Sequence, residues 1–244
     1  MTVQLNHKVH VLFRREDLDM VRLENKVVIV LDVLFATSTM ITALAHGARG
    51  VIPTLDELGA REAATRHSPE SYVLSGELHA ETIPGFVSPT PLVLIGHGVQ
   101  DKTLIYSTTN GTVALRNASA APHVYAGALL NAQALVRHVA SHHRKETILI
   151  ICSGSMGNPN LEDMYGAGCF VDLIEREMGE RDLSDASHAA RALYRSERAE
   201  SALMRCRVGQ MMQERGLAEE VKFAARTNVL DVVPKLVGGE LRVV

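Results

Sequence analysis

The sequence predicts an α/β fold: a mostly parallel sheet with helices on both faces, three layers in all, formed by one domain over residues 1–244. Short β-branched segments alternate with helical segments along the whole chain. Two strand segments, VVIVLD at 27–32 and ILIIC at 148–152, are continuously apolar, as central strands covered on both faces require. Hydrophobic residues make up 46% and charged residues 22% of the chain, which excludes a disordered chain.

Seven segments predict strands, each bounded by turn residues or by a helical segment. In chain order they are KVHVLF (8–13), KVVIVLD (26–32), GVIPT (50–54), SYVLSGE (71–77), KTLIYST (102–108), HVYAGAL (123–129) and ETILIICSG (146–154). Four long segments have helical spacing between or after them: residues 37–48, 54–67, 129–143 and 161–179. The first is expected to end at Gly47 in a glycine C-cap, and VALRNA (113–118) predicts a further helix.

The last part of the chain predicts a different arrangement. Residues 184–219 are rich in charge and contain no proline, so we expect two helices that close the domain. Heptad spacing is not sustained there, which argues against a coiled coil. The terminal NVLDVVPKLVGGELRVV (228–244) predicts a β-hairpin that turns at Gly238-Gly239.

Charge and cysteine content narrow the classes of partner and compartment. The chain has 25 basic and 28 acidic residues and no basic block, which argues against nucleic acid as a partner. The three cysteines form no CxxC pair, as expected in a reducing compartment. No leader peptide is evident at the start, and no apolar run reaches the roughly 18 residues of a membrane span. We therefore expect a cytoplasmic protein without membrane partners, and a homodimer by default.

Polar residues follow four of the predicted strands at the point where each strand ends. Ligands of open α/β sheets collect at this edge, so these residues are the first candidates for a site. They are Asp32 after the second strand; Gly76 and Glu77 at the end of the fourth; Ser107 to Thr112 after the fifth; and Cys152 to Ser155 after the seventh, with Glu162 and Asp163 soon after. The combination predicts a divalent cation and a phosphorylated or otherwise anionic ligand.

The chemistry of these groups supports both halves of that prediction. Mg²⁺ prefers oxygen and usually takes one or two protein carboxylates together with water and substrate phosphate. Asp32, Glu77, Glu162 and Asp163 can supply them. Helix N-termini carry unpaired N–H groups, which the segments 36–39 and 108–112 could direct at an anion.

Each candidate also has a simpler alternative. Asp32 could cap the following helix, and STTNGT (107–112) could be an ordinary polar turn. The Glu162-Asp163 pair could be first-turn residues favoured by the helix dipole. Cys152 at the end of a buried strand fits a small core residue better than a nucleophile. The histidines at 138, 142 and 143 lack a matching carboxylate in the sequence, so a solvated helix face is favoured over a zinc site.

Two phosphatase templates fail on inspection. A cysteine-dependent phosphatase loop needs an arginine six positions after the cysteine, and Asn158 stands there after Cys152. Haloacid-dehalogenase-type phosphatases need a second aspartate two residues after the first, and Leu34 stands there after Asp32. Neither GxxxxGK[ST] nor GxGxxG occurs.

Seven segments in order resemble the 2-phosphosulfolactate phosphatase family over about residues 27–234. They are VLDVLFATSTMITALAHGARGVIP, SGE, PGF followed by SP, STTNGTVAL, GALLNAQAL, CSGSMGNPNLEDMYGAG and DVVP. The resemblance implies an α/β/α, cytoplasmic, Mg²⁺-dependent phosphatase that hydrolyses 2-phosphosulfolactate to sulfolactate and phosphate.

Carried over by position, the resemblance assigns roles to the residues at the strand ends. Catalysis is expected of Asp32, Glu162 and Asp163, and Mg²⁺ ligation of Asp32, Glu77 and Asp163. Phosphate or substrate binding is expected of Thr37, Ser38, Thr39, Thr108, Thr109, Asn110, Gly111, Thr112 and Cys152. Either Asp32 attacks phosphorus directly or a carboxylate such as Asp163 orients a metal-bound water; the sequence leaves both open.

Two departures from the family pattern fall in the same region. Phe35 stands where the family has an arginine able to grip a phosphate or sulfonate, and the segment 85–89 lacks the family's aspartate and asparagine. These changes point to three alternatives: a different phosphate ester, an arginine supplied from elsewhere such as Arg116, or a non-catalytic anion-binding homologue. A lyase or isomerase using the same groups is a further alternative.

Overall fold

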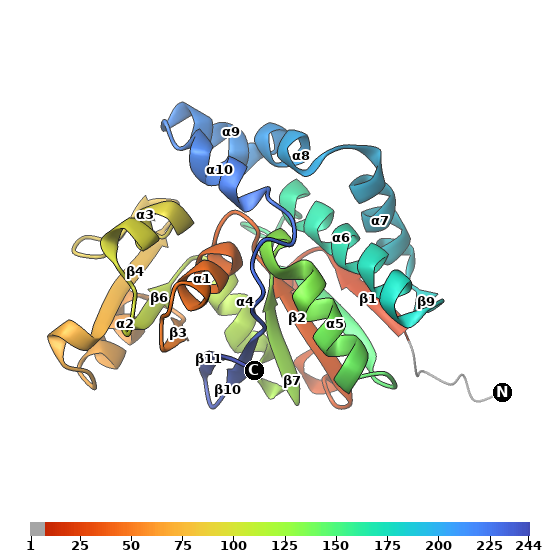
Figure 1. Ribbon diagram of the computed structural model, residues 1–244, viewed down its shortest axis with the longest axis horizontal. Coiled ribbons are helices and arrows are strands. Elements are labelled where there is room, and N and C mark those ends of the chain that lie inside the picture. Colours follow the sequence, from red (N-terminus) through yellow and green to blue (C-terminus); the bar gives the residue numbers. More distant parts are fainter. Residues whose placement is uncertain (1–7) are drawn as a thin grey trace.

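The computed structural model describes residues 8–244 and places all strands in one eleven-stranded sheet (Figure 1). The expectation about a leader peptide concerns residues 1–7, which lie outside the described part. The strands are β1 (Lys8–Leu12), β2 (Lys26–Leu31), β3 (Gly50–Thr54), β4 (Tyr72–Leu78), β5 (Glu81–Thr82), β6 (Thr103–Ser107), β7 (His123–Gly127), β8 (Thr147–Cys152), β9 (Asp182–Leu183), β10 (Pro234–Val237) and β11 (Glu240–Val243). All seven strands predicted from the sequence are present, and β5 and β9 are short additions at the two edges of the sheet.

The sheet is mostly parallel, as predicted. Its order is β5-β4-β6-β3-β11-β10-β7-β2-β8-β1-β9. The central strand β2 pairs in parallel with β7 and with β8, so that Ile29 lies between Tyr125 and Ile150. Antiparallel pairing occurs at β5 and around the hairpin β10–β11.

Residues 8–244 form ten α-helices around the sheet. They are α1 (Ala36–Ala45), α2 (Glu57–Ala64), α3 (Pro91–His97), α4 (Gly111–Asn117), α5 (Ala132–His142), α6 (Leu161–Met178), α7 (Asp185–Ser196), α8 (Ala199–Arg205), α9 (Arg207–Glu214) and α10 (Ala218–Ala224). Short 3₁₀ turns are η1 (Arg15–Asp17), η2 (Met20–Arg22), η3 (Pro69–Ser71), η4 (Ala118–Ala120) and η5 (Leu129–Asn131). From Lys8 onward no helix has the length and apolar character that crossing a membrane requires.

Alternate residues of β2 enter two different cores, which makes the fold three-layered. Val27, Ile29 and Leu31 pack in the cluster that contains α5 and α6. Val28 and Val30 pack in the cluster that contains α1 and α4. All five side chains are fully buried, so the continuous apolar run follows from burial on both faces. The predicted three-layer α/β fold is confirmed.

The helical prediction for residues 184–219 was wrong in number. Three helices, α7, α8 and α9, stand where two were expected, and a fourth, α10, begins at Ala218 and runs beyond the predicted range. Extended backbone at Glu197 separates α7 from α8, and extended backbone at Cys206 separates α8 from α9. The Cys206 thiol accepts a hydrogen bond from the Gly209 N–H (3.2 Å) and so caps α9, a role that sequence rules reserve for hydroxyl and carboxyl side chains.

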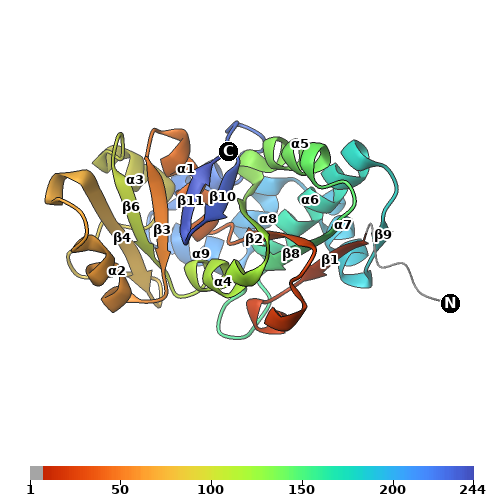
Figure 2. The same ribbon diagram turned by 90° about the horizontal axis from the view of Figure 1, so that it is seen from below.

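The C-terminal hairpin forms at the predicted turn but lies in the middle of the sheet. Both Gly238 and Gly239 have positive φ, and β10 and β11 pair from Pro234–Val243 to Val237–Glu240. Figure 2 shows the hairpin between β3 and β7, where it joins the two halves of the sheet. The predicted end of α1 is also confirmed, because Gly47 follows the helix at φ +85°.

Candidate active site

A cavity of about 530 Å³ opens at the carboxyl ends of β2, β4, β6 and β8. The loops after these strands form its floor. Residues of α9 and the turn before α10 form the opposite wall, which is largely apolar. The lining includes Asp32, Phe35, Glu77, Thr108, Thr109, Asn110, Gly154, Arg207, Val208, Met211, Met212, Arg215 and Leu217. The cavity therefore lies at the carboxyl ends of the strands, where the site was predicted.

Asp32 follows β2 and lies at the floor of this cavity. Its Oδ1 accepts a hydrogen bond from the Ala36 N–H at 3.1 Å, and no described residue donates to Oδ2. The Thr37 hydroxyl bonds both the N–H (3.0 Å) and the carbonyl (2.9 Å) of Asp32, which holds the turn rigid. Burial, together with the nearby charges of Glu77 and Glu162, raises the pKa of Asp32 to about 7.

Glu77 holds the loop after β6 against the end of β4. Its Oε1 accepts the Thr109 N–H at 2.6 Å, and its Oε2 accepts the Thr109 hydroxyl at 3.0 Å and the Ala80 N–H at 2.6 Å. Both oxygens are therefore occupied by the protein itself. The principal role of this carboxylate in the structure is to position the loop.

The loop after β6 is closed by its own hydroxyl groups. The Thr112 Oγ1 accepts the Thr108 N–H at 3.0 Å, and the Thr108 Oγ1 accepts the Thr112 N–H at 3.2 Å. Gly111 is required because a Cβ there would lie 2.6 Å from Asp32 Oδ2 and 2.4 Å from the Ala36 Cβ. The STTNGT segment thus brings its backbone into contact with the Asp32 carboxylate.

Asp163 joins the loops after β2 and β8 from beneath the cavity. One oxygen accepts the Val33 N–H at 2.9 Å and the other accepts the Gly154 N–H at 3.1 Å. The side chain is 1% exposed and does not line the cavity. Burial and the neighbouring charges of Asp32 and Glu162 hold the pKa of Asp163 well above its usual range.

Glu162 is buried beside this group and leaves one oxygen without a partner. Its side chain is 2% exposed, and Oε1 has no hydrogen-bond donor. Burial raises the pKa of Glu162, while Arg207 opposes that rise. A buried carboxylate oxygen with no donor is costly, and a bound cation or a proton would satisfy it.

Several residues predicted to bind phosphate have side chains that the protein uses internally. Thr37 bonds Asp32, the Ser38 hydroxyl donates to the Val33 carbonyl (2.8 Å), and the Thr39 hydroxyl donates to the Pro89 carbonyl (2.8 Å). Together with Gly111, Thr112 and Cys152 they do not line the cavity.

The Cys152 side chain is fully buried in the core that contains α6, and burial raises the pKa of its thiol well above the usual range. Placement in the core matches the alternative that treated Cys152 as a packing residue. The prediction of substrate contact by this thiol is corrected, because its sulfur is neither accessible nor ionised at neutral pH.

Mg²⁺ ligation by Asp32, Glu77 and Asp163 stays a prediction, and the three carboxylates differ in how far the protein already uses their oxygens. Within residues 8–244, Asp32, Glu77 and Asp163 do not form a group whose oxygens all lie within 4.8 Å of one another. The oxygens of Glu77 and Asp163 already accept backbone N–H groups, whereas Asp32 Oδ2 and Glu162 Oε1 do not. One or two carboxylates are sufficient for an ion that keeps several waters.

Three arginines near the cavity were missed by the sequence analysis. Arg15 donates to the Asn110 side chain at 2.6 Å and to the Ser153 carbonyl at 3.2 Å, and its positive charge opposes the raised pKa of Asp32. Arg207 and Arg215 line the opposite wall. Arg15 lies three residues after Leu12, the end of β1, so the rule that located Asp32 could also have found it.

The arginine suggested as a replacement lies elsewhere. Arg116 belongs to α4, and its Nη1 is the nearest atom, at 3.2 Å, to a Cβ built on Gly239 in the C-terminal hairpin turn. It does not line the cavity. The expectation that Arg116 supplies the guanidinium missing at Phe35 was wrong.

Comparison with known proteins settles the family. The family model described as 2-phosphosulpholactate phosphatase matches residues 12–239. The chain belongs to the 2-phosphosulfolactate phosphatase family. Relatives named probable 2-phosphosulfolactate phosphatase include one from Carboxydothermus hydrogenoformans, 36% identical over 230 residues (93% of this chain and 92% of the relative). Another, from Caldanaerobacter subterraneus subsp. tengcongensis, is 34% identical over 223 residues (90% and 91%). A third, from Clostridium beijerinckii, is 30% identical over 236 residues (96% and 98%).

The segments that resemble the family differ in what their residues do in the structure. Asp32, Thr109 and Asn110 face the cavity, whereas Gly168 serves packing. A Cβ at Gly168 would lie 2.0 Å from the Ala190 carbonyl oxygen, so the glycine allows α6 and α7 to approach closely. The segments that resemble the family therefore contain both residues that line the cavity and residues, such as Gly168, that pack helices together.

Proposed function

We propose that the protein is a Mg²⁺-dependent phosphoric monoester hydrolase that acts on a small phosphorylated acid, 2-phosphosulfolactate or a related ester. The observation that carries the proposal is Asp32, a buried carboxylate at the cavity floor with one oxygen that no residue engages. The family assignment and the guanidinium of Arg15 nearby support it.

Asp32 is the carboxylate that would hold the ion, because it lines the cavity and its Oδ2 accepts from no described residue. When bound, Mg²⁺ supplies positive charge to the transferring phosphoryl group. The chain itself positions the reactants: Thr37 and Ala36 fix Asp32, and Arg15 fixes the Asn110 side chain. Asp32 either attacks phosphorus or accepts a proton from the attacking water, and its neighbours keep both routes open.

The arginines supply the attraction for an anionic substrate. Arg207 and Arg215 line the wall, and Arg15 lies behind the lining residue Asn110, to which it donates, so a phosphorylated acid in the cavity meets two arginines with a third close by. Arg207 and Arg215 supply guanidinium groups to the cavity although Phe35 stands where the family has an arginine. They weaken the first of the two arguments for a non-catalytic homologue, while the second, the shortened segment 85–89, stands.

Apolar groups on both the floor and the opposite wall of the cavity bear on the group at the other end of the substrate. Phe35, Val208, Met211 and Leu217 all line the cavity. An ester whose second group is less strongly charged than a sulfonate would lose less hydration there. The apolar lining therefore bears on whether the substrate is 2-phosphosulfolactate or a less charged relative, and it favours the less charged one.

Phosphate release tests the function directly. Purified protein is assayed with 2-phosphosulfolactate, phospholactate and phosphoglycolate, with Mg²⁺ and with chelator, beside an Asp32→Asn variant. We expect metal-dependent release that the variant loses by at least about a thousandfold. Product analysis separates hydrolysis from a lyase or isomerase, since only hydrolysis releases inorganic phosphate. Absence of release from every ester by folded protein would overturn the proposal.

A further inference from the structure

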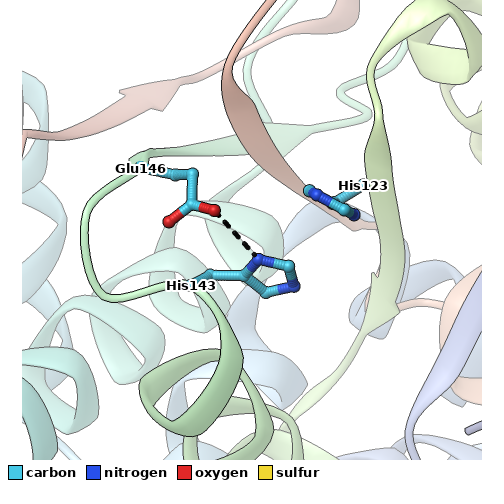
Figure 3. A group of neighbouring side chains, drawn as sticks. All are labelled: His123, His143 and Glu146. Atoms are coloured by element: carbon cyan, nitrogen blue, oxygen red, sulfur yellow. Dashed lines mark hydrogen bonds and ion pairs between the residues drawn. The ribbon is translucent and has the colours of Figure 1, made fainter.

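A second cluster of ligand-type side chains lies at the opposite edge of the sheet from the cavity. His123 begins β7, His143 follows the end of α5, and Glu146 directly precedes β8. One ligand atom from each lies within 4.8 Å of the other two. Figure 3 shows the three side chains converging from separate elements. No other trio of histidine, cysteine or acidic residues in the described part of the chain meets this spacing.

The hydrogen bonding of the cluster is incomplete. His123 Nδ1 is buried and has no hydrogen-bond partner. Within the described chain, the one hydrogen bond inside the trio joins His143 Nδ1 to Glu146 Oε1 at 3.4 Å, longer than a good charge-assisted hydrogen bond, and the His123 and His143 rings contact each other with centres 4.3 Å apart. Two donors about 2.1 Å from a tetrahedral ion lie roughly 3.4 Å from each other. The spacing therefore suits two ligands of one ion better than a direct pair.

Neighbouring side chains orient the His143 ring. Tyr125 Oη lies 2.9 Å from His143 Nε2 and 3.1 Å from His138 Nε2. If His143 Nε2–H donates to Tyr125, its Nδ1 lone pair faces Glu146 and His123. A metal-binding histidine usually has such a partner on its other nitrogen.

The charges around the cluster favour neutral imidazoles. Burial lowers the pKa of His123 and of His143, and Lys235, over the Tyr125 ring at 5.8 Å, lowers both further. His138 and His142 stack on each other beside the cluster. Glu146 provides the negative charge that a cation needs next to Lys235. Its side chain is 30% exposed, so water can complete the coordination.

We propose that His123, His143 and Glu146 bind a divalent transition-metal ion, with Zn²⁺ as the best match and water in the remaining position. Two imidazoles and one carboxylate form a ligand set typical of Zn²⁺, whereas Mg²⁺ prefers oxygen alone. The bound ion would connect the first residue of β7 and the residue before β8 to the end of α5. The ion stabilises the folded state, because the ligands come together only when the chain folds.

Metal titration of protein without a histidine tag tests the proposal. The titration uses Zn²⁺ in competition with a chromophoric chelator, and Co²⁺ absorption in parallel. An Asp32→Asn background removes the carboxylate proposed to hold Mg²⁺. We expect one equivalent bound, at least tenfold weaker binding in Glu146→Gln and in His123→Gln, and unchanged binding in His142→Gln, whose ring is adjacent but outside the trio. Saturating Zn²⁺ should raise the thermal midpoint of the parent protein and of His142→Gln only.

Equal affinity in the parent, Glu146→Gln and His123→Gln proteins would overturn the proposal, as would failure to bind Zn²⁺ at micromolar concentration. Circular dichroism of each variant without metal shows that it is folded. Glu146 and His123 are preferred to His143 for substitution, because the His143 side chain is only 7% exposed and supports the Tyr125 network. A Co²⁺ spectrum of fully octahedral, all-oxygen type would also contradict imidazole ligation.

Discussion

Asp32 is a carboxyl group whose burial destabilises the folded protein at neutral pH. Its pKa rises from 3.8 to about 7 on folding. Between these values the folded chain keeps a proton that the unfolded chain has released. Its contribution to the free energy of unfolding therefore falls as the pH rises from about 4 to 7, and stays low above that.

We predict that Asp32→Asn abolishes phosphatase activity and stabilises the metal-free protein at pH 8, by about 2 kcal/mol or roughly 4–8 °C. Asparagine keeps the acceptor for the Ala36 N–H and cannot ionise. Thermal melts at pH 8 and pH 4.5 measure the effect, and the gain should shrink at the lower pH. A variant less stable than the parent protein at pH 8 would contradict the assigned cause.

Asparagine at position 163 should lower the stability of the protein, whereas asparagine at position 32 should raise it. Both oxygens of Asp163 accept backbone N–H groups, so an amide NH₂ in either place faces a donor. We predict that Asp163→Asn destabilises the protein by about 2–4 kcal/mol. Denaturant titration beside Asp32→Asn makes the comparison, since the two aspartates differ mainly in how their oxygens are used. Equal effects of the two substitutions on the free energy of unfolding would contradict this prediction.

Arg15 should act through substrate attraction. We predict that Arg15→Met raises KM and lowers kcat/KM at least tenfold, because it removes positive charge beside Asp32 and frees the Asn110 side chain. Arg22→Met is the matched control, since its side chain is 83% exposed and pairs only with Asp19 among described residues. Steady-state kinetics at several salt concentrations measure both variants. An unchanged KM for Arg15→Met would remove Arg15 from the site.

Sequence reasoning located these residues better than it assigned their roles. The predicted parallel direction of the strands alone places Asp32, Glu77 and Asn110 at one edge, because carboxyl ends of parallel strands meet there. The partner of each hydroxyl group depends on tertiary contacts, which the direction of the strands does not determine. Thr39, for instance, donates to Pro89, which lies 50 residues away in the chain.

At the scale of elements, Glu220 links the wall of the cavity to the rest of the fold. From α10 its carboxylate accepts the N–H groups of Leu92 (2.8 Å) and Val93 (3.0 Å) at the start of α3, and the Thr90 hydroxyl at 2.8 Å. It therefore caps α3 from another helix. Sequence rules look for a cap within a few residues, which explains why α3 was not predicted.

We predict that Glu220→Gln destabilises the protein by about 1–3 kcal/mol and loosens α9 and α10 over the cavity. Glu219→Gln is the matched control, because Glu219 is the adjacent residue and its side chain is 76% exposed. Thermal melts and amide hydrogen exchange measure stability and local opening. Equal exchange in α10 of the two variants would show that the cap does not hold this wall.

At the scale of the whole molecule, the order of the strands is what the sequence did not predict. Local pattern identifies β10 and β11 as a hairpin because Gly238-Gly239 marks the turn. Their place between β3 and β7 rests on two pairings, Leu241 with Val51 and Lys235 with Tyr125. Contacts between residues so far apart in the chain leave no local signal.

The hairpin should consequently control the stability of the entire sheet. Leu241 is fully buried in the core shared by α1 and α4, whereas Val243 in the same strand is 49% exposed. We predict that Leu241→Ala lowers the free energy of unfolding by about 2–4 kcal/mol and that Val243→Ala changes it by less than about 1 kcal/mol. The unfolding transition of Leu241→Ala should stay single, because loss of the hairpin exposes the edges of β3 and β7 together. Denaturant titration followed by both circular dichroism and tyrosine fluorescence tests this, since two separated transitions would mean that the halves of the sheet fold without the hairpin.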